Sequence, residues 1–179
     1  MSELTHDQIL AQWQAEEAEA RKRFMEPGLA RPEQMRGKTG LEQLQAMLAG
    51  EAPPPFIGQT MDFTLLRVSF GEAIFQGTPL LRHYNPLGGV HGGWFATLLD
   101  SALGCAVHSA MPVGSAYTTL EFKVNLVRGL STKVPLVRAI GRTVHVGRQT
   151  ATAEAQLVGH DGKLYAHAST TCLVFEMKG

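Results

Sequence analysis

The sequence predicts an α+β fold in which an antiparallel β-sheet wraps around one long apolar helix, preceded by a helical extension. Three observations lead to this prediction. Residues 94–111 form one apolar segment of helical length with a single carboxylate. Six β-rich runs lie around it in the chain, two before and four after. The first 55 residues show helical spacing instead of strand patterns.

Composition limits the classes of protein to consider. The chain has 179 residues, of which 44% are hydrophobic and 18% charged, so it can bury a core. Sixteen basic residues balance sixteen acidic ones, which gives no argument for nucleic acid binding. No apolar stretch has the ~18 residues of a membrane span, and the polar N-terminus does not resemble a secretory signal. We therefore expect a cytoplasmic protein that binds neither nucleic acid nor membrane. The two isolated cysteines, Cys105 and Cys172, are interpreted as buried apolar residues.

Residues 1–55 are predicted to form a helical N-terminal extension. An amphipathic helix is expected over residues 5–24, capped by Thr5 or Asp7, and a second over residues 39–51, ending at Gly50. Prolines and glycines between them indicate a linker. Prolines 53–55 mark the domain boundary. The extension has nine acidic and six basic residues and no helix-turn-helix pattern, so we interpret it as an arm that packs on the domain or a neighbouring subunit, or covers an active-site mouth.

Residues 56–179 are predicted to form the main domain. From Phe56 the pattern changes to strands, with a hairpin turn near Gly71. A glycine-rich segment, the apolar helix to about Ala110 and four more strands follow. A sheet of this kind can bury its single apolar helix only by curving around it. That architecture is the hotdog fold.

Asp100 is the residue that needs explaining, because it lies in a helix with apolar residues on every side. Burying an unpaired carboxylate costs several kcal/mol (about 2–7 for a polar group) or raises its pKa. Either a hydroxyl such as that of Ser101 or Thr97 satisfies the carboxylate, or the carboxylate has a chemical role. The residues alone leave both explanations open.

His91-Gly92-Gly93 directly precede this helix. Glycines there allow a sharp turn, and the first N–H groups of a helix are unpaired and electropositive, so the Gly92 N–H could bind an oxyanion. The other interpretation is a plain loop-to-helix junction. Nine residues separate His91 from Asp100, about 13 Å along a helix. If Asp100 is catalytic, we expect a site shared across a two-fold dimer axis.

The segment "NPLGGVHGGWFATLLD", with "YTTLEFKVNLVRG" and "VHVGRQTATAEAQL" after it, resembles the PaaI-like (phenylacetate-degradation type) acyl-CoA thioesterases of the hotdog superfamily. The resemblance covers about residues 56–176. It implies hydrolysis of an acyl-CoA to a free acid and coenzyme A, with no cofactor, because coenzyme A is part of the substrate. It also implies a homodimer with shared active sites, commonly assembled as a tetramer. "LVRG" departs from the family's usual arginine-proline at the end of its strand.

The resemblance also implies a role for each matching residue. Asp100 is the nucleophile or the general base, the Gly92 N–H polarises the thioester oxygen, and His91 orients the thioester. Asn85 positions the thioester or the attacking water. Thr119 holds the water or Asp100, although alternation along the strand leaves Thr118 as a competitor.

Coenzyme A phosphates require positive charge. Arg148, after Gly147, matches the family's glycine-arginine position. Further candidates are Arg128, Arg142 and Lys133. The alternative interpretation of each of these basic residues is a solvated residue at the end of a strand. The histidines show no metal-ligand spacing, so no metal is predicted.

Three questions stay open at the level of sequence. Trp94, Phe95, Leu98, Tyr84 and Met111 line either an acyl pocket or the core. The acyl group is undefined. The reaction itself has two alternatives, hydration or dehydration of an acyl thioester and acyl-CoA sensing without turnover.

Overall fold

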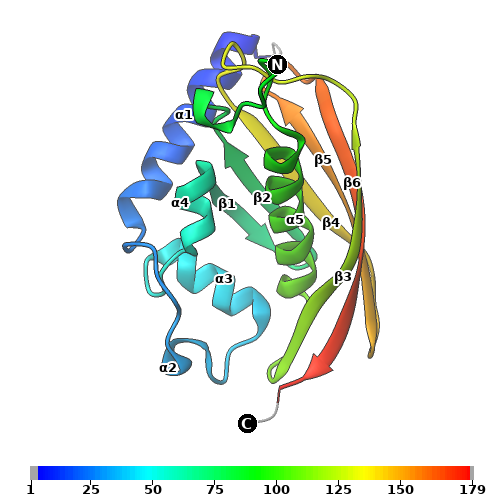
Figure 1. Ribbon diagram of the computed structural model, residues 1–179. Helices are drawn as coiled ribbons and strands as arrows, with labels where there is room; N and C mark the ends of the chain where they lie inside the picture. Colours follow the sequence, from blue (N-terminus) through cyan, green and yellow to red (C-terminus); the bar gives the residue numbers. More distant parts are fainter. Residues whose placement is uncertain (1–3, 178–179) are drawn as a thin grey trace.

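The computed structural model describes residues 4–177 and contains a single antiparallel sheet in the order β1-β2-β4-β5-β6-β3 (Figure 1). The strands are β1 (Phe63–Ser69), β2 (Glu72–Gly77), β3 (Ser115–Leu126), β4 (Val137–Val146), β5 (Thr150–Gly159) and β6 (Leu164–Glu176). Between β2 and β3 the chain forms a short 3₁₀ turn, η1 (Leu81–His83), and the long helix α5 (Gly92–Ser109). The predicted order of two strands, one helix and four strands is confirmed.

Helix α5 lies across the face of the sheet that curves toward it (Figure 1). Its contact residues are fully buried, among them Leu98, Leu99 and Leu103 at 0% exposure. Gly141 on β4 allows the helix backbone to approach closely, because a Cβ at that position would lie 2.3 Å from the Ala102 carbonyl oxygen. This close contact fixes the height of the helix above the sheet.

Gly141→Ala is expected to destabilise the protein by about 1–3 kcal/mol, because the added methyl group must push α5 off β4. For a chain of this size the melting temperature should fall by roughly 3–10 °C. Gly129→Ala is the matched control, since a Cβ at residue 129 meets no atom within 4 Å. Thermal unfolding of both variants checks the prediction, and equal melting temperatures would contradict it.

The helix α5 is not equally buried on all sides. Ala96, Thr97, Asp100, Ser101 and Cys105 are only partly buried, at a spacing that forms one stripe along the helix. Most of the sheet covers the opposite face, and β3 reaches this stripe at Asp100, so the stripe escapes full burial. Asp100 lies within it.

The extension contains the two predicted helices, α1 (His6–Arg23) and α3 (Gly40–Ala49). Thr5 caps α1 in a reciprocal capping box with Gln8, and Gly50 ends α3 with a left-handed backbone (φ 78°). Two short helices were missed. α2 (Pro32–Met35) lies in the predicted linker, and α4 (Phe56–Met61) occupies a segment predicted to begin a strand. Pro32 is the first residue of α2, where proline is favoured, which explains the first error. Pro55 is the N-cap of α4, so the prolines that mark the boundary also lead directly into a helix.

Helix α1 packs on the side of the sheet that faces away from α5. Gly77 on β2 faces Trp94 and Leu98 of α5, so its neighbour Gln76 points to the opposite face. There the Gln76 amide donates to the Trp13 carbonyl (3.2 Å) and to Glu17 (2.6 Å). The extension is thereby held on the domain of its own chain.

Arg138 of β4 completes this contact. Its guanidinium donates to Gln76 Oε1 (2.8 Å) and Glu16 Oε2 (2.6 Å) and lies 4.2 Å from the centre of the Trp13 ring. Arg138 is only 7% exposed, so its charge depends on these partners. Arg67 of β1 pairs with the same Glu16 carboxylate.

Within residues 4–177 none of the helices combines the length and the apolar character that crossing a bilayer requires.

Candidate active site

Asp100 lies halfway along α5 and is half-buried. The Thr119 hydroxyl on β3 donates to its Oδ1 at 3.4 Å. Burial raises the pKa of Asp100 above its usual 3.8, and the bond from Thr119 offsets only part of that rise. The carboxylate is therefore a stronger base than an exposed aspartate, as a group that takes a proton from water must be.

The hydroxyls proposed to satisfy Asp100 from its own helix bind elsewhere. Ser101 donates to the Thr97 carbonyl (2.9 Å), and Thr97 donates to the Gly93 carbonyl (2.8 Å). The explanation that Asp100 is held by Ser101 or Thr97 is therefore wrong. Thr119 faces the carboxylate, whereas its neighbour Thr118 is exposed.

The raised pKa of Asp100 has a consequence for stability. The folded protein favours the protonated carboxyl, so the stability that this group contributes is full below pH 3.8 and is lost as the pH rises through its raised pKa. Asp100→Asn cannot ionise. Its stability relative to wild type is therefore expected to increase as the pH rises from about 3.5 to about 7, which denaturant midpoints at several pH values measure. A difference that does not vary with pH would contradict the raised pKa.

His91 is the N-cap of α5. Its Nδ1 accepts the Gly93 N–H at 2.9 Å, so the neutral ring carries its proton on Nε2, and the ring is exposed. The His91 N–H donates to the His83 carbonyl at 2.8 Å. The imidazole is thus oriented with an N–H donor facing outward.

The Gly92 N–H is the first of the helix. Among the hydrogen bonds of residues 4–177, none involves this N–H, whereas the next two N–H groups, those of Gly93 and Trp94, both bind to His91. A lone unpaired N–H at the positive end of an 18-residue helix is suited to an oxyanion.

Asn85 organises the glycine-rich loop before α5. Its Oδ1 accepts the N–H groups of Leu87 (2.9 Å) and Gly89 (3.3 Å). The side-chain oxygen is therefore used for loop structure, and the amide NH₂ is the part of Asn85 that can contact a substrate.

Sequence reasoning missed His83, which supports this loop. Its ring is buried, stacks on Trp94 (centroids 5.5 Å apart) and accepts the Leu80 N–H at Nδ1 (3.1 Å). Nε2 lies 3.2 Å from Asp62 Oδ2, off the angle of a hydrogen bond. Burial lowers the pKa of His83, so the ring is neutral. The sequence offered no signal for this role, because stacking on Trp94 depends on tertiary packing.

The candidate residues form two groups within one chain. His91, Gly92 and Asn85 lie at the N-terminus of α5, and Asp100 with Thr119 lies nine residues further on, about 13 Å along the helix axis. Next to the second group, β3 forms an edge of the sheet and exposes Leu120 and Phe122.

The basic residues proposed for coenzyme A do not come together within one chain. Arg128 follows β3 at the end of the sheet where β4 begins, and Arg148 lies in the turn after β4, at the other end of a strand about 30 Å long. Arg142 pairs with Glu72 (2.7 Å) on the outer face. Gly147 closes the turn through a bond to the Thr150 carbonyl (2.8 Å).

The residues proposed to line either an acyl pocket or the core can be located in the structure. Trp94, Phe95, Leu98 and Met111 are at most 2% exposed, so they form core and not an acyl pocket. In the part of the chain described, residues 4–177, no cluster of three His, Cys, Asp or Glu side chains is arranged to hold a metal.

Comparison with known proteins gives a consistent result. The family model of the Thioesterase superfamily matches residues 87–166. PA1618 of Pseudomonas aeruginosa PAO1, named as a candidate esterase, is 32% identical over 99 residues, which are 55% of this chain and 67% of that protein. A candidate thioesterase of Ralstonia eutropha JMP134, named as related to phenylacetic acid degradation, is 28% identical with a TM-score of 0.66, covering 72% of this chain and 97% of that one. The phenylacetic acid degradation protein PaaI of Thermus thermophilus, solved as a single-residue mutant, is 27% identical with a TM-score of 0.59, covering 65% and 96%.

Proposed function

The chain belongs to the Thioesterase superfamily and is a thioester hydrolase, and we propose that it hydrolyses acyl-coenzyme A thioesters with Asp100 as its catalytic carboxylate. One observation carries this proposal: a half-buried carboxylate of raised pKa, held by Thr119, on a helix whose own N-terminus presents an unpaired N–H. Hydrolysis of a thioester needs a base or nucleophile and a donor for the developing oxyanion. These two groups supply both.

The proposed site is shared by two subunits. About 12 Å of helix separates Gly92 from Asp100 in one chain, too far for both to contact one carbonyl. Edge strand β3 offers unpaired backbone groups and exposed Leu120 and Phe122, which favour pairing with a second copy. When two copies of the chain pair along β3 about a two-fold axis, the N-terminus of α5 in one copy lies next to Asp100 of the other copy.

The reaction then proceeds in two steps. In one route, the ionised Asp100 carboxylate takes a proton from water, and the resulting hydroxide adds to the thioester carbonyl. In the other route, the carboxylate itself adds to that carbonyl, and water then hydrolyses the acyl-Asp100 anhydride. The Gly92 N–H of the other subunit donates to the oxyanion, His91 Nε2–H and the Asn85 amide orient the thioester, and the sulfur leaves and is protonated to the free thiol. Single turnover in ¹⁸O-water that leaves ¹⁸O in the Asp100 side chain establishes the nucleophilic route, with water attacking the Asp100 carbon of the anhydride. ¹⁸O in the product acid alone fits both routes, and trapping of the acyl-Asp100 anhydride then distinguishes them.

The proposed function is tested by thiol release from acetyl-, hexanoyl-, palmitoyl-, benzoyl- and phenylacetyl-CoA. Release of free thiol with equimolar acid is the expected result, and the ranking of substrates defines the acyl group. Loss of enoyl-CoA absorbance without thiol release would indicate a hydratase instead. Binding of acyl-CoA without turnover would indicate a sensor.

The remaining parts of the proposal rest on the sequence resemblance. Coenzyme A carries several phosphates, and Arg128, Arg142 and Arg148 are proposed to meet them in an assembly of at least two subunits, because one chain holds these arginines apart. We place the hydrolase domain at residues 56–179 and the protein in the cytoplasm.

A further inference from the structure

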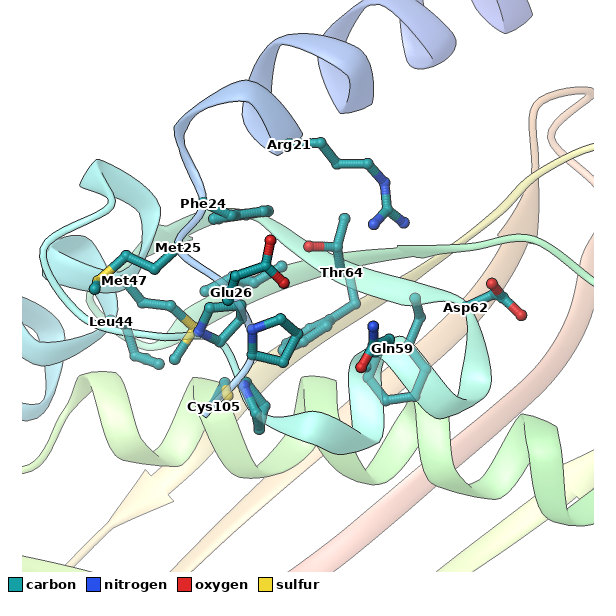
Figure 2. A pocket seen from close by; sticks show the side chains of 17 residues that line it. Arg21, Phe24, Met25, Glu26, Leu44, Met47, Gln59, Asp62, Thr64 and Cys105 are labelled. Carbon is teal, nitrogen blue, oxygen red and sulfur yellow. The ribbon is translucent and has the colours of Figure 1, made fainter. Parts of the chain in front are cut away.

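A pocket of about 320 Å³ lies between the extension and the domain, away from the candidate active site (Figure 2). The end of α1 with the segment after it, α3 and residues 54–55 line it from the extension, and α4, β1, β2 and α5 line it from the domain. Cys105 is its contact with α5, five residues after Asp100 and about 140° further around the helix. His91, Asp100 and Thr119 do not line it.

The interior of the pocket is apolar and rich in rings and sulfur. Phe24 and Met47 of the extension and Cys105 of α5 line it (Figure 2), together with Phe63 and Phe75 of the sheet. Burial raises the pKa of Cys105 to about 12, so the thiol is neutral. An engineered apolar cavity of about 150 Å³ stays dry and binds benzene. A pocket of about twice that volume therefore has room for an apolar group of at least roughly eight carbons.

The mouth of the pocket is polar but has little net charge. Arg21 Nε is bound to Glu17 (2.7 Å), Asp62 is paired with Arg82, and Glu26 adds one carboxylate. The Thr64 side chain also lines the pocket, on a residue that is 8% exposed, and brings one hydroxyl to it. Because two of these three charged groups are already paired, the mouth offers mainly hydrogen-bonding partners to a polar head.

We propose that this pocket is a binding site for a small uncharged amphiphile, whose apolar tail of roughly eight carbons lies among Phe24, Met47 and Phe63 and whose hydroxyl or amide head binds Thr64. The ligand would touch α1's end, α3, β1 and α5 at once. It therefore joins the extension to the domain, and it does so whether or not the protein is an acyl-CoA thioesterase.

The test is a fluorescence titration of the full-length protein with N-phenyl-1-naphthylamine, an uncharged aryl probe. Wild type is expected to bind one probe per chain. Cys105→Phe fills the pocket from α5 and is expected to weaken binding at least tenfold. Leu29→Ala, a change at a residue of the extension that is 84% exposed and outside the pocket, should bind within twofold of wild type. Absence of saturable binding to wild type, or equal binding to Cys105→Phe, would overturn the proposal.

A second variant tests the pocket independently in case Cys105→Phe misfolds, and a displacement experiment tests whether the head group is charged. Phe24→Ala removes an apolar wall from the extension side and should also weaken probe binding, without touching α5. Displacement of the probe by 1-octanol is expected to need at least fivefold lower concentration than displacement by octanoate or octylammonium. Stronger displacement by either ion would show that the head is charged and would overturn that part of the proposal.

Discussion

Asp100→Asn is expected to lower kcat for thioester hydrolysis by about 10²–10⁴-fold, the usual contribution of a positioned base. The amide has the shape of the carboxylate and can still accept the Thr119 hydroxyl, but it cannot take a proton or attack a carbonyl. Because burial already disfavours the charge at this position, the variant should fold at least as well as wild type at neutral pH. Thiol release and thermal unfolding, measured on the same preparations, check both parts.

Ser101→Ala is the control for Asp100→Asn. Ser101 is the next residue of the partly buried stripe, and its hydroxyl bonds only to the helix, so its removal should change kcat less than about twofold. If Asp100→Asn keeps the wild-type rate, the carboxylate is not the catalytic group. If it loses its fold, the carboxylate has a structural role that the geometry does not indicate.

Gly92→Pro is expected to lower kcat by about 10²–10³-fold, the cost of one lost oxyanion donor. Proline removes the N–H and little else. Gly92 is the first residue of α5, where proline is favoured, and His91 before it has the extended backbone (φ −63°, ψ 137°) that proline requires. A Cβ at residue 92 meets only the flexible end of Leu126, 3.1 Å from Cδ1.

Mixing the two inactive variants tests the shared site. In a hybrid of one Asp100→Asn and one Gly92→Pro subunit, one of the two sites contains only wild-type groups. Random exchange should therefore restore about a quarter of the wild-type activity. Gly92→Ala, which keeps the N–H, is the control and should retain most of its activity. No recovery after demonstrated subunit exchange would place Gly92 and Asp100 in sites within one chain.

The sequence predicted the sheet and its helix well because their signals are local. Alternation, apolar runs and turn residues mark β2 or β6 without knowledge of their neighbours, and Thr5 or Gly50 mark helix ends by their own chemistry. The short helices α2 and α4 were missed because the prolines at their starts, Pro32 in the first turn of α2 and Pro55 at the N-cap of α4, are also typical of a linker.

The site was predictable in its residue types but not in its contacts. Asp100 is conspicuous as a charge in an apolar helix, yet the identity of its partner depends on how β3 lies against α5, which no spacing along the chain encodes. For the same reason the sequence could not show that the proposed coenzyme A arginines lie apart. Residues 128 and 148 are close in sequence, but they lie at opposite ends of β4. His83 was missed for this reason as well.

The position of α1 restricts how copies of this protein can assemble. Trp13, Glu16 and Glu17 already occupy the outer face at Gln76 and Arg138, so the half of the sheet formed by β1, β2 and β4 is closed to back-to-back stacking of two sheets. Only the half formed by β5, β6 and β3 remains open for such stacking. Any tetramer built on the outer faces must therefore be offset toward β3, and the extension, through its place on the sheet, selects among quaternary structures that the hotdog domain alone would allow.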